Sequence, residues 1–445
     1  MKFSLTRLVV FAGLLAGSAM ASAWTVEPGI GAGLLYTDNA ALKSKNEDDD
    51  LVVVGYLGAD INEADGPFTL NATTSLLYTN YTEDTFSDQY YVNLGANAAW
   101  VAIRDRLDWR AENYFTQRQI NSLDANTPDN NQNTNVFSFG PNFYFPISGR
   151  QRVTLRPEVQ DFYFEKSDTD NRRYILSADW RYQLNQRMTT GLDGTVTKVD
   201  YDDEDKNPNY IATDIHGILS GTRPRSDYTL NLGATRINRD KFDSQDGFSG
   251  SLTWLYQMTG HSTARAYLST SLTDSNQQLL DSELNPDNGD FNNEQISGDV
   301  LRSNTARLTY RRQDSTLNAE VWGEYRDLDY KESPNDRDVK ETGARLDYRI
   351  TPLITTGVLG RYNRTKEKDT GRTDKRYTIG ANIAYQLSRK LRTKFDIQYR
   401  NKDSTQSDSE YSEISAFISL VYGFRDLSRP SGGSGRSSGR SSGTN

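Results

Sequence analysis

Charged and aromatic side chains recur at every second position in the segment 317–326. Glu320, Trp322, Glu324 and Arg326 alternate there with small or apolar residues. Because successive side chains of a β-strand point to opposite faces, these four residues would share one face of a strand. A wall of carboxylates, guanidinium groups and indole rings offers weak, repeated contacts to polar solutes or sugars, as conduction through a pore requires. The segment therefore predicts one wall of a water-filled passage.

The same alternation extends this inner face to several other segments. A charge that faces lipid costs roughly 2–4 kcal/mol at the bilayer midplane, so the restriction of Arg and Glu to one parity indicates a wet face. An alternative is that paired basic and acidic side chains only neutralise and stiffen the wall. The predicted translocation path comprises Arg156, Glu158, Arg181, Arg307, Arg311, Glu320, Trp322, Glu324, Arg326, Arg345, Arg349, Arg361, Arg392, Lys394 and Arg400.

One segment carries the residue types of a hydrolytic triad. Asp214, His216 and Ser220 share a face by parity. Residues two and six positions apart on one strand lie about 7 to 20 Å from each other, which is too far for a proton relay unless neighbouring strands complete the set. We therefore expect no catalytic residue and no enzymatic activity.

Cysteine usage and the acidic loops bear on cofactors. The chain has no cysteine, which excludes disulfides, thiolate metal ligands, covalent haem attachment and a lipoprotein anchor. The acidic stretches 200–205 and 287–290 offer oxygen ligands, but neither has the ordered spacing of a calcium loop. We expect neither a metal nor a cofactor.

The elements that position the inner face are long alternating segments, of which 412–424 is the clearest. Ile414 and Leu420 lie on its apolar face, and Tyr422 and Phe424 end the segment on that same face. Such alternation is typical of a strand between two different media. We expect this strand to close the barrel against the first one, with Tyr422 and Phe424 as the assembly signal.

The first 23 residues have the features of a cleaved signal peptide. Lys2 and Arg7 flank the start of an apolar stretch, and Ala21-Ser22-Ala23 has the small residues of a cleavage site. No later segment approaches the roughly 18 consecutive apolar residues of a transmembrane helix. After cleavage the chain could therefore span a membrane only as a closed barrel.

Residues 24–424 divide into alternating segments joined by short turns at one end and longer polar loops at the other. Turns such as 64–67 would be periplasmic, and loops such as 38–49, 121–134 and 278–299 would face outside the cell. Counting gives about twenty antiparallel strands, or eighteen if two weak segments are discounted, with both termini periplasmic. A soluble β-sandwich or solenoid also alternates, but its strands are shorter. The prediction is an all-β fold, a transmembrane antiparallel β-barrel.

The tail and the net charge limit the choice of partners. Residues 425–445 are rich in Ser, Gly and Arg, which predicts a disordered periplasmic extension. The formal net charge of −9 becomes about −11 once Lys2 and Arg7 leave with the signal peptide. This charge disfavours nucleic acid as a partner.

The start of the expected mature chain resembles a known family. The sequence reads WTVEP at 24–28, LYTDNAAL at 35–42 and LYTNY at 77–81. These segments resemble the outer-membrane β-barrel porin family associated with exopolysaccharide and PEP-CTERM (exosortase) systems. The resemblance implies a translocation channel for a secreted polysaccharide.

The expected function is export of a polysaccharide by passive conduction through the charged, aromatic-containing lumen. The chain would lie in the bacterial outer membrane among lipid and lipopolysaccharide. Further expected partners are the barrel-assembly machinery, a polysaccharide chain and periplasmic export components. A general or solute-specific uptake porin would have the same fold. An alternative of another class is a structural or adhesive barrel with functional acidic loops, which conductance would distinguish from a channel.

Overall fold

The computed structural model describes residues 24–240, 242–278 and 296–423. The predicted signal peptide, the acidic stretch 287–290, Phe424 and the tail 425–445 lie outside the described residues. In the part that is described, no helix has the length and apolar character needed to cross a membrane.

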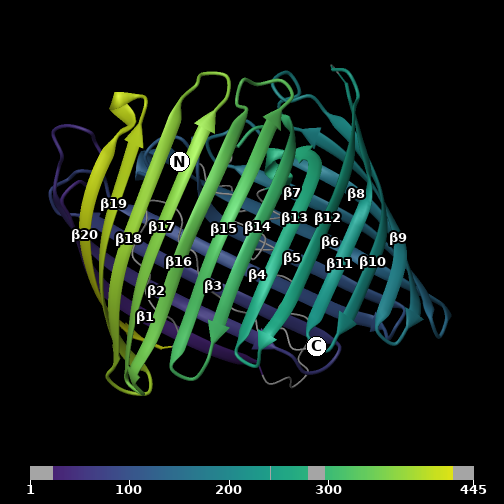
Figure 1. Cartoon of the computed structure of the whole chain (residues 1–445), viewed down its shortest axis with the longest axis horizontal. Helices are drawn as coiled ribbons and strands as arrows, with labels where there is room; N and C mark the ends of the chain where they lie inside the picture. The colour runs from purple at the N-terminus through teal and green to yellow at the C-terminus, as the bar shows by residue number, and fades with distance from the viewer. Residues whose placement is uncertain (1–23, 241, 279–295, 424–445) are drawn as a thin grey trace.

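The described chain is almost entirely β-structure (Figure 1). Two short 3-10 helices, Pro128–Asn130 and Ser407–Ser409, lie in connections. The strands are β1 (Thr25–Thr37), β2 (Asp50–Glu63), β3 (Phe68–Tyr81), β4 (Gln89–Ile103), β5 (Leu107–Gln119), β6 (Asn131–Ser148), β7 (Gln151–Phe164), β8 (Asn171–Asn185), β9 (Met188–Tyr201), β10 (Tyr210–Arg223), β11 (Ser226–Arg239), β12 (Gln245–Thr259), β13 (Ser262–Asp274), β14 (Val300–Gln313), β15 (Leu317–Tyr330), β16 (Arg337–Thr351), β17 (Ile354–Glu367), β18 (Thr373–Gln386), β19 (Leu391–Ser404) and β20 (Tyr411–Tyr422).

The strands form one closed antiparallel sheet. Each strand pairs with its neighbours in sequence, and β1 also pairs with β20, from Ile30 opposite Tyr422 to Thr37 opposite Ser415. The sheet has 20 strands, so the predicted number is confirmed and the alternative of eighteen is wrong. The first strand starts and the last strand ends at the side of the short turns, which is the periplasmic side of outer-membrane barrels.

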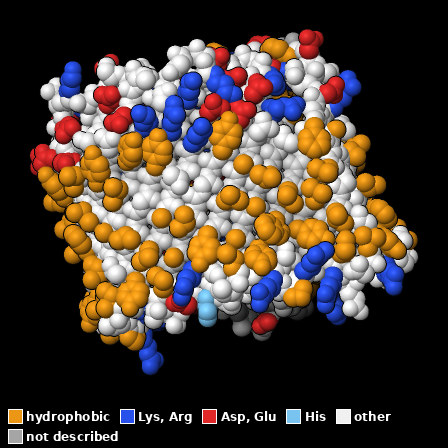
Figure 2. Space-filling view, viewed as in Figure 1, with side chains coloured by type: hydrophobic (Ala, Val, Ile, Leu, Met, Phe, Trp, Pro, Cys, Tyr) orange, Lys and Arg blue, Asp and Glu red, His pale blue; other side chains and the backbone are white. Residues whose placement is uncertain are grey.

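The two faces of the sheet differ in polarity. Leu308, Ile215 and Ile379 point outward and are 66%, 63% and 62% exposed. Figure 2 shows apolar side chains in a broad band around the middle of the barrel, with Lys, Arg, Asp and Glu gathered above and below it. An apolar belt between charged rims matches a bilayer, because lipid removes the cost of exposing these side chains to water. The predicted alternation between lipid and lumen is confirmed.

Close approach at two glycines allows the barrel to close. On the inner face, the ring of Phe417 of β20 lies over Gly33 of β1, where an added Cβ would be 2.6 Å from Phe417 Cε2. Gly31 is similarly close to Val421, at 3.0 Å from its Cγ2. The glycines of the segment 25–36 therefore make room for the last strand.

Candidate functional site

Ion pairs cover much of the inner wall between β14 and β15. Arg307 Nη1 lies 2.5 Å from Glu324 Oε2, and Arg326 Nε lies 2.8 Å from Glu324 Oε1. Nearer the short turns, Arg311 Nε lies 3.2 Å from Glu320 Oε2. The cross-strand register sets these contacts, since Arg307 stands opposite Glu324 and Arg311 opposite Glu320. Pairing on this wall neutralises much of its charge.

An indole, a carboxylate and a guanidinium group meet further along the same wall. Trp322 Nε1 donates to Glu341 Oε1 at 2.9 Å, and Arg361 Nη2 donates to Glu341 Oε2 at 2.6 Å. The Trp322 ring covers Gly343, where an added Cβ would be 2.2 Å from its Cζ2. A flat ring beside paired charges is a surface suited to weak contacts with a sugar.

The structure places every member of the predicted path on the inner face, but it does not gather them into one site. Arg345 pairs with Asp347 at 2.9 Å and Lys394 with Asp396 at 3.4 Å, each on one strand. Arg400 pairs with Glu413 of the next strand. The remaining members are spread over several strands: Arg156 and Glu158 on β7, Arg181 on β8, Arg349 on β16 and Arg392 on β19.

The loop between β5 and β6 folds into the lumen, contrary to the prediction that it faces outside. Arg376 Nη2 of β18 donates to Ser122 O at 2.8 Å, and Arg372 Nη2 donates to Leu123 O at 3.0 Å. Ser122 and Leu123 are 1% and 7% exposed. The loop crosses the interior because its residues find their hydrogen-bond partners on strands far from β5 and β6.

Asparagine side chains build the base of this loop. Ile120 N donates to Asn130 O at 2.9 Å, and Asn130 Nδ2 donates to Asn121 O at 2.8 Å and to Ala125 O at 2.9 Å. Leu123 N donates to Asn121 Oδ1 at 3.0 Å. These bonds satisfy backbone groups that no strand partner reaches, so the Asn-rich sequence supports a fixed loop shape.

The ends of β13 and β14 next to the long loops, here called the upper ends, also turn into the lumen. The β12–β13 ladder begins at Gly250 opposite Thr270, whereas the β13–β14 ladder continues to Asp274 opposite Val300. Beyond Thr270, β13 thus leaves β12 and stays with β14. An added Cβ on Gly247 of β12 would be 2.3 Å from Arg302 Nη2 of β14. This approach places the upper part of β14 against the inner side of β12.

Packing confirms the inward turn of β13 and β14. Leu272 and Val300 are buried in one cluster with Val199, Tyr210 and Ile237, which lie on β9, β10 and β11. Leu272 and Val300 continue the parity that faces lipid nearer the short turns. At the ends next to the long loops, this face therefore packs against the inner wall. Ile296, in the connection between β13 and β14, is buried with Phe162 and Phe164 of β7, so the prediction that this connection lies outside is corrected for its described residues.

A buried ion pair fastens this segment to β8 of the inner wall. Arg173 Nη2 of β8 lies 2.8 Å from Asp274 Oδ1 of β13, and the two side chains are 1% and 0% exposed. Tyr210 donates its hydroxyl to Asp274, and Arg173 Nη1 donates to Gln277 Oε1 at 3.0 Å. The Arg173 guanidinium carbon lies 4.3 Å from the centroid of the Phe162 ring. Hydrogen bonds and stacking offset the cost of burying both charges.

Two carboxyl groups next to the inward segment have pKa values shifted from their ordinary values. Burial, followed by a hydrogen bond with Glu332, raises the pKa of Asp299 to about 7. Burial opposes ionisation of Glu332 as well, but hydrogen bonds with Asp299 and Arg239 lower the pKa of Glu332 overall. Asp299 also accepts from Ser333 N at 2.9 Å and Ser333 Oγ at 2.6 Å. A neutral Asp299 that donates to Glu332 fits this arrangement.

His216 of β10 contacts an aspartate of β9 and a serine of β12. His216 Nε2 lies 2.8 Å from Ser249 Oγ, and His216 Nδ1 lies 3.5 Å from Asp193 Oδ1. Asp214 instead accepts from the hydroxyl of Thr235, which also lies 3.0 Å from Ser249 Oγ. The partners of His216 therefore differ from the Asp214 and Ser220 suggested by the sequence, because register across strands sets the contacts.

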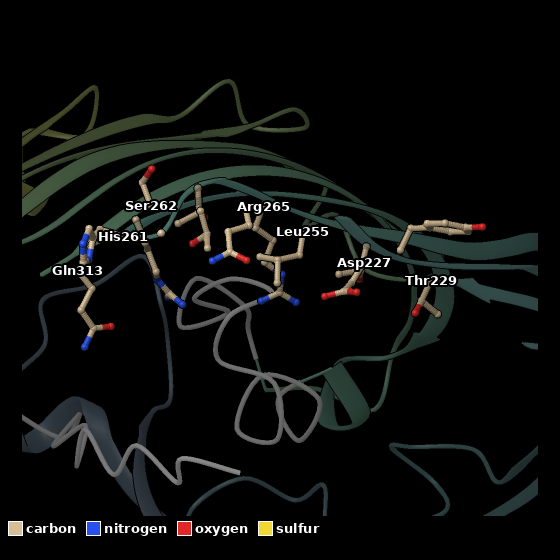
Figure 3. A pocket seen from close by; sticks show the side chains of 14 residues that line it. Asp227, Thr229, Leu255, His261, Ser262, Arg265 and Gln313 are labelled. Carbon is tan, nitrogen blue, oxygen red and sulfur yellow. The ribbon is translucent and has the colours of Figure 1, made fainter. Parts of the chain in front are cut away.

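A hollow of about 690 Å³ opens on the inner wall near the short turns. Its lining includes Asp227, Leu255, Arg265, Arg311 and Gln313 from β11 to β14. In Figure 3, side chains such as Asp227 and Gln313 project from the sheet into the barrel interior. The hollow is part of the lumen below the two inward segments.

Sequence reasoning missed the contacts that cross the lumen. Arg337, Arg376 and Lys402 are on inner-face parity, but no short-range pattern shows that the loop 120–130 meets them. A signal was present for Asp274, an acidic residue at a position that continues the lipid-facing parity of Leu268. Charge at such a position indicates that the strand end has left the bilayer.

A part of the chain matches a known family. Residues 337–424 match the family described as "Putative beta-barrel porin 2". The match covers the last five strands and excludes the segments near the mature start that carry the resemblance to exopolysaccharide-associated barrels. No curated protein matches the sequence.

The solved structures similar to this chain include outer-membrane proteins at low identity. The FrpB iron transporter from Neisseria meningitidis (F3-3 variant) has 10% identity and a TM-score of 0.49, over 89% of this chain and 82% of that chain. A ferric enterobactin receptor (PfeA) from Pseudomonas aeruginosa has 10% identity and a TM-score of 0.49, over 91% and 82%.

A loop-deletion mutant of OmpT from Vibrio cholerae has 9% identity and a TM-score of 0.37, over 91% of this chain and 100% of that chain. Similarities at this level identify neither a substrate nor an activity for this chain.

The closed barrel of 20 strands, its apolar outer belt and the match to a porin family make the protein a porin-like barrel of the bacterial outer membrane, set among lipid and lipopolysaccharide.

Proposed function

We propose that the barrel exports a secreted polysaccharide across the outer membrane by passive conduction. The observation that carries the proposal is the meeting of Trp322, Glu341 and Arg361 on the inner wall, beside the paired charges of β14 and β15. An aromatic face with polar groups at its edge suits successive sugar rings, and pairing keeps each contact weak. Weak, repeated contacts let a chain enter and leave, whereas tight binding would stall it.

The inward segments narrow the path of such a chain. The loop 120–130 and the upper ends of β13 and β14 lie in the half of the lumen next to the long loops. A barrel of this strand number without inward segments would leave a wide aqueous channel. A narrowed lumen favours an extended polymer threaded end-on over bulky folded cargo.

Catalysis is not part of the proposed function. Ser249, the serine that contacts His216, is 4% exposed. A nucleophile buried to that extent cannot reach a substrate, and backbone N–H groups engaged in a β-ladder do not form an oxyanion hole. In the proposal, His216 of β10, Ser249 of β12 and Asp193 of β9 join strands of the wall.

The proposed partners follow from the location. The chain would be inserted by the barrel-assembly machinery through its last strand, which ends at Tyr422 among the described residues. The transported polysaccharide would reach the lumen from periplasmic export components. The short-turn end, where the proposed chain enters, carries the hollow lined by Asp227, Arg265 and Arg311.

The decisive experiment measures polysaccharide in a strain that lacks this gene and in the same strain with the gene restored on a plasmid. Loss of secreted polymer together with periplasmic accumulation supports export. Unchanged secretion overturns the proposed export.

A second candidate is a general or solute-specific uptake porin, which is favoured by the porin description of the family matched over 337–424. Slowed uptake of small solutes with normal secretion would select this candidate.

A further inference from the structure

Six arginines lie at four neighbouring short turns of the barrel. These turns join β4 to β5, β6 to β7, β8 to β9 and β10 to β11. All six residues are exposed, and none of their side chains has a hydrogen bond or ion pair with another of the described residues. The six, named the arginine rim below, are Arg104, Arg106, Arg150, Arg187, Arg223 and Arg225.

Hydrogen bonds fix the backbone that carries these arginines. Arg187 N donates to Asn185 Oδ1 at 2.9 Å. In the turn between β4 and β5, Arg106 N donates to Ile103 O at 3.0 Å. Successive turns on one edge of the sheet are two strands apart, which places them roughly 10 Å from each other. The arginine rim is therefore an arc of cations on tight, well-defined turns.

Acidic residues gather at the other end of the same strands. The long loops that follow β3, β5, β7 and β9 contain 12 Asp or Glu residues and two Lys residues, in the segments 82–88, 120–130, 165–170 and 202–209. Within the four short turns, Asp105 is the only acidic residue. Asp108 of β5 and Asp227 of β11 lie near these turns but face the lumen. Figure 2 shows mainly Lys and Arg along the lower edge of the face in view, where the short turns lie.

Tryptophans on the outer face mark the level of the lipid headgroups next to the arginine rim. Trp100 of β4 stands opposite Trp109 of β5, close to the turn that joins these strands. Trp254 of β12 is 43% exposed, and its Nε1 donates to Ser226 Oγ at 2.7 Å, one residue beyond Arg225. Trp is enriched where the hydrocarbon of a membrane meets the headgroups. The arginines lie beyond these rings, at the level of the lipid phosphates.

Arg223 continues the lipid-facing side of β10. Ile215 is 63% exposed on the outer face of this strand, and Arg223 has the same parity and stands opposite Ser226. A strand tilted by about 40° gains roughly 2.5 Å of height per residue, so Arg223 lies about 20 Å below Ile215. The apolar band of such a barrel is only about 25 Å tall. Arg223 is thus past the edge of the hydrocarbon and still on the side that faces lipid.

We propose that the arginine rim binds the phosphate groups of anionic phospholipids in the periplasmic leaflet of the outer membrane. A guanidinium group donates two parallel hydrogen bonds to a phosphate, which the ammonium group of lysine cannot do, and every basic residue of these four turns is arginine. The segment 425–445 is not a suitable occupant, because it has four arginines and one aspartate. The proposal concerns the lipid contact and does not depend on what the lumen conducts.

The test compares two brominated lipids as quenchers of tryptophan fluorescence. The full chain is reconstituted into vesicles of phosphatidylcholine that contain a small fraction of brominated phosphatidylglycerol, which is anionic, or of brominated phosphatidylcholine, which has no net charge. Trp100, Trp109 and Trp254 report on the lipid next to the arginine rim. We expect phosphatidylglycerol to be preferred about fivefold, the factor that one arginine near an anionic surface contributes.

A variant of the arginine rim removes three of its charges without a change in the strands. In Arg187→Gln, Arg223→Gln, Arg225→Gln, the two brominated lipids should quench about equally, because the side chains no longer attract a phosphate. Heat-modifiable mobility in gels checks that the variant is folded. An unchanged preference for phosphatidylglycerol in the folded variant overturns the proposal.

A matched control removes the same number of charges from the outer face next to the long loops. Arg172, Lys198 and Arg236 have side chains that are 50%, 55% and 59% exposed, and each pairs with a carboxylate. The variant Arg172→Gln, Lys198→Gln, Arg236→Gln should keep the preference for phosphatidylglycerol. Equal loss of the preference in this control and in the rim variant would show that net charge attracts the lipid, and would overturn the arginine rim as the site.

An acidic polymer is the other ligand whose charge would suit the arginine rim. Calorimetry with polygalacturonate and the full chain folded in detergent tests this alternative. Equal quenching by the two lipids in the unchanged protein, with polygalacturonate binding that the rim variant loses, would assign the rim to an acidic polymer and overturn the lipid site. Polymer secretion is measured separately, so the proposed export and the lipid site can fail independently.

Discussion

Arg173 of β8 and Asp274 of β13 form an ion pair in which both side chains are buried, although four strands separate β8 from β13 in the sheet. The pair holds the inward end of β13 and β14 against the wall at β8. Removal of one partner from a buried pair typically costs roughly 3–5 kcal/mol, because the other charge remains buried. Asp274→Ala should therefore release the inward segment while the rest of the barrel stays paired.

Amide hydrogen exchange measures this release. In Asp274→Ala, the amides of 270–274 and 300–303 should exchange much faster, and those of β1 and β20 should not change. Arg345→Met is the matched control, because Arg345 and Asp347 form a pair in which Arg345 is 60% exposed. An exposed pair contributes about 0–1 kcal/mol. Equal exchange in the two variants would contradict the role of the buried pair.

The contact between Asp299 and Glu332 should make the inward segment sensitive to pH. The pKa of Asp299 is raised from its ordinary value to about 7, mainly by burial and then by the hydrogen bond with Glu332. A carboxyl group with a raised pKa stabilises the folded arrangement fully below its unfolded pKa, and this stabilisation is lost as pH rises through about 7. Ionised Asp299 would repel Glu332, so the contact should weaken between neutral and alkaline pH.

Single-channel recording at pH 6 and pH 8 checks this expectation. Conductance should rise with pH if the inward segment loosens. Asp299→Asn keeps a neutral hydrogen-bonding side chain at both pH values, so its conductance should stay near the pH 6 level of the unchanged protein. A variant that keeps the original pH dependence would show that another group titrates.

The orientation of β18 predicts opposite effects of arginine at two nearby positions. Ile379 is 62% exposed on the outer face, where arginine near the midplane should cost roughly 2–4 kcal/mol. Asn382 faces the lumen opposite Asp396 of β19, so arginine there gains a carboxylate neighbour. The folded fraction in outer membranes should fall in Ile379→Arg and stay unchanged in Asn382→Arg. The reverse result would invert the assignment of the two faces.

Residue types show the wall but not the contacts across the lumen. Arg307 and Leu308 can be assigned to the inner and outer faces from the sequence, because polar and apolar side chains alternate along the strand. The bond between Arg337 and Ser122 joins residues 215 positions apart, and no periodicity gives the destination of a loop. Likewise, the contact of His216 with Ser249 depends on registers accumulated over two strand pairs. The sequence therefore predicts strands, faces and pairs on adjacent strands, but not inward segments.

Closure of the barrel should depend on the absence of a side chain at Gly33. An added Cβ there would be 2.6 Å from the Phe417 ring and 2.9 Å from Ile418 O. Gly33→Ala should therefore force the last strand away from the first. At Gly323, an added Cβ meets nothing within 4 Å. Gly323→Ala is a matched control that adds the same methyl group to a strand.

Assembly kinetics into liposomes should separate these two variants. Gly33→Ala should slow the appearance of the heat-modifiable folded form, since β1 and β20 must pair last to remove both free edges of the sheet. Gly323→Ala should assemble at the original rate. If Gly33→Ala shares that rate, then Tyr422 and the ladder from Ile30 onward suffice for closure, and the Phe417 ring moves aside without cost.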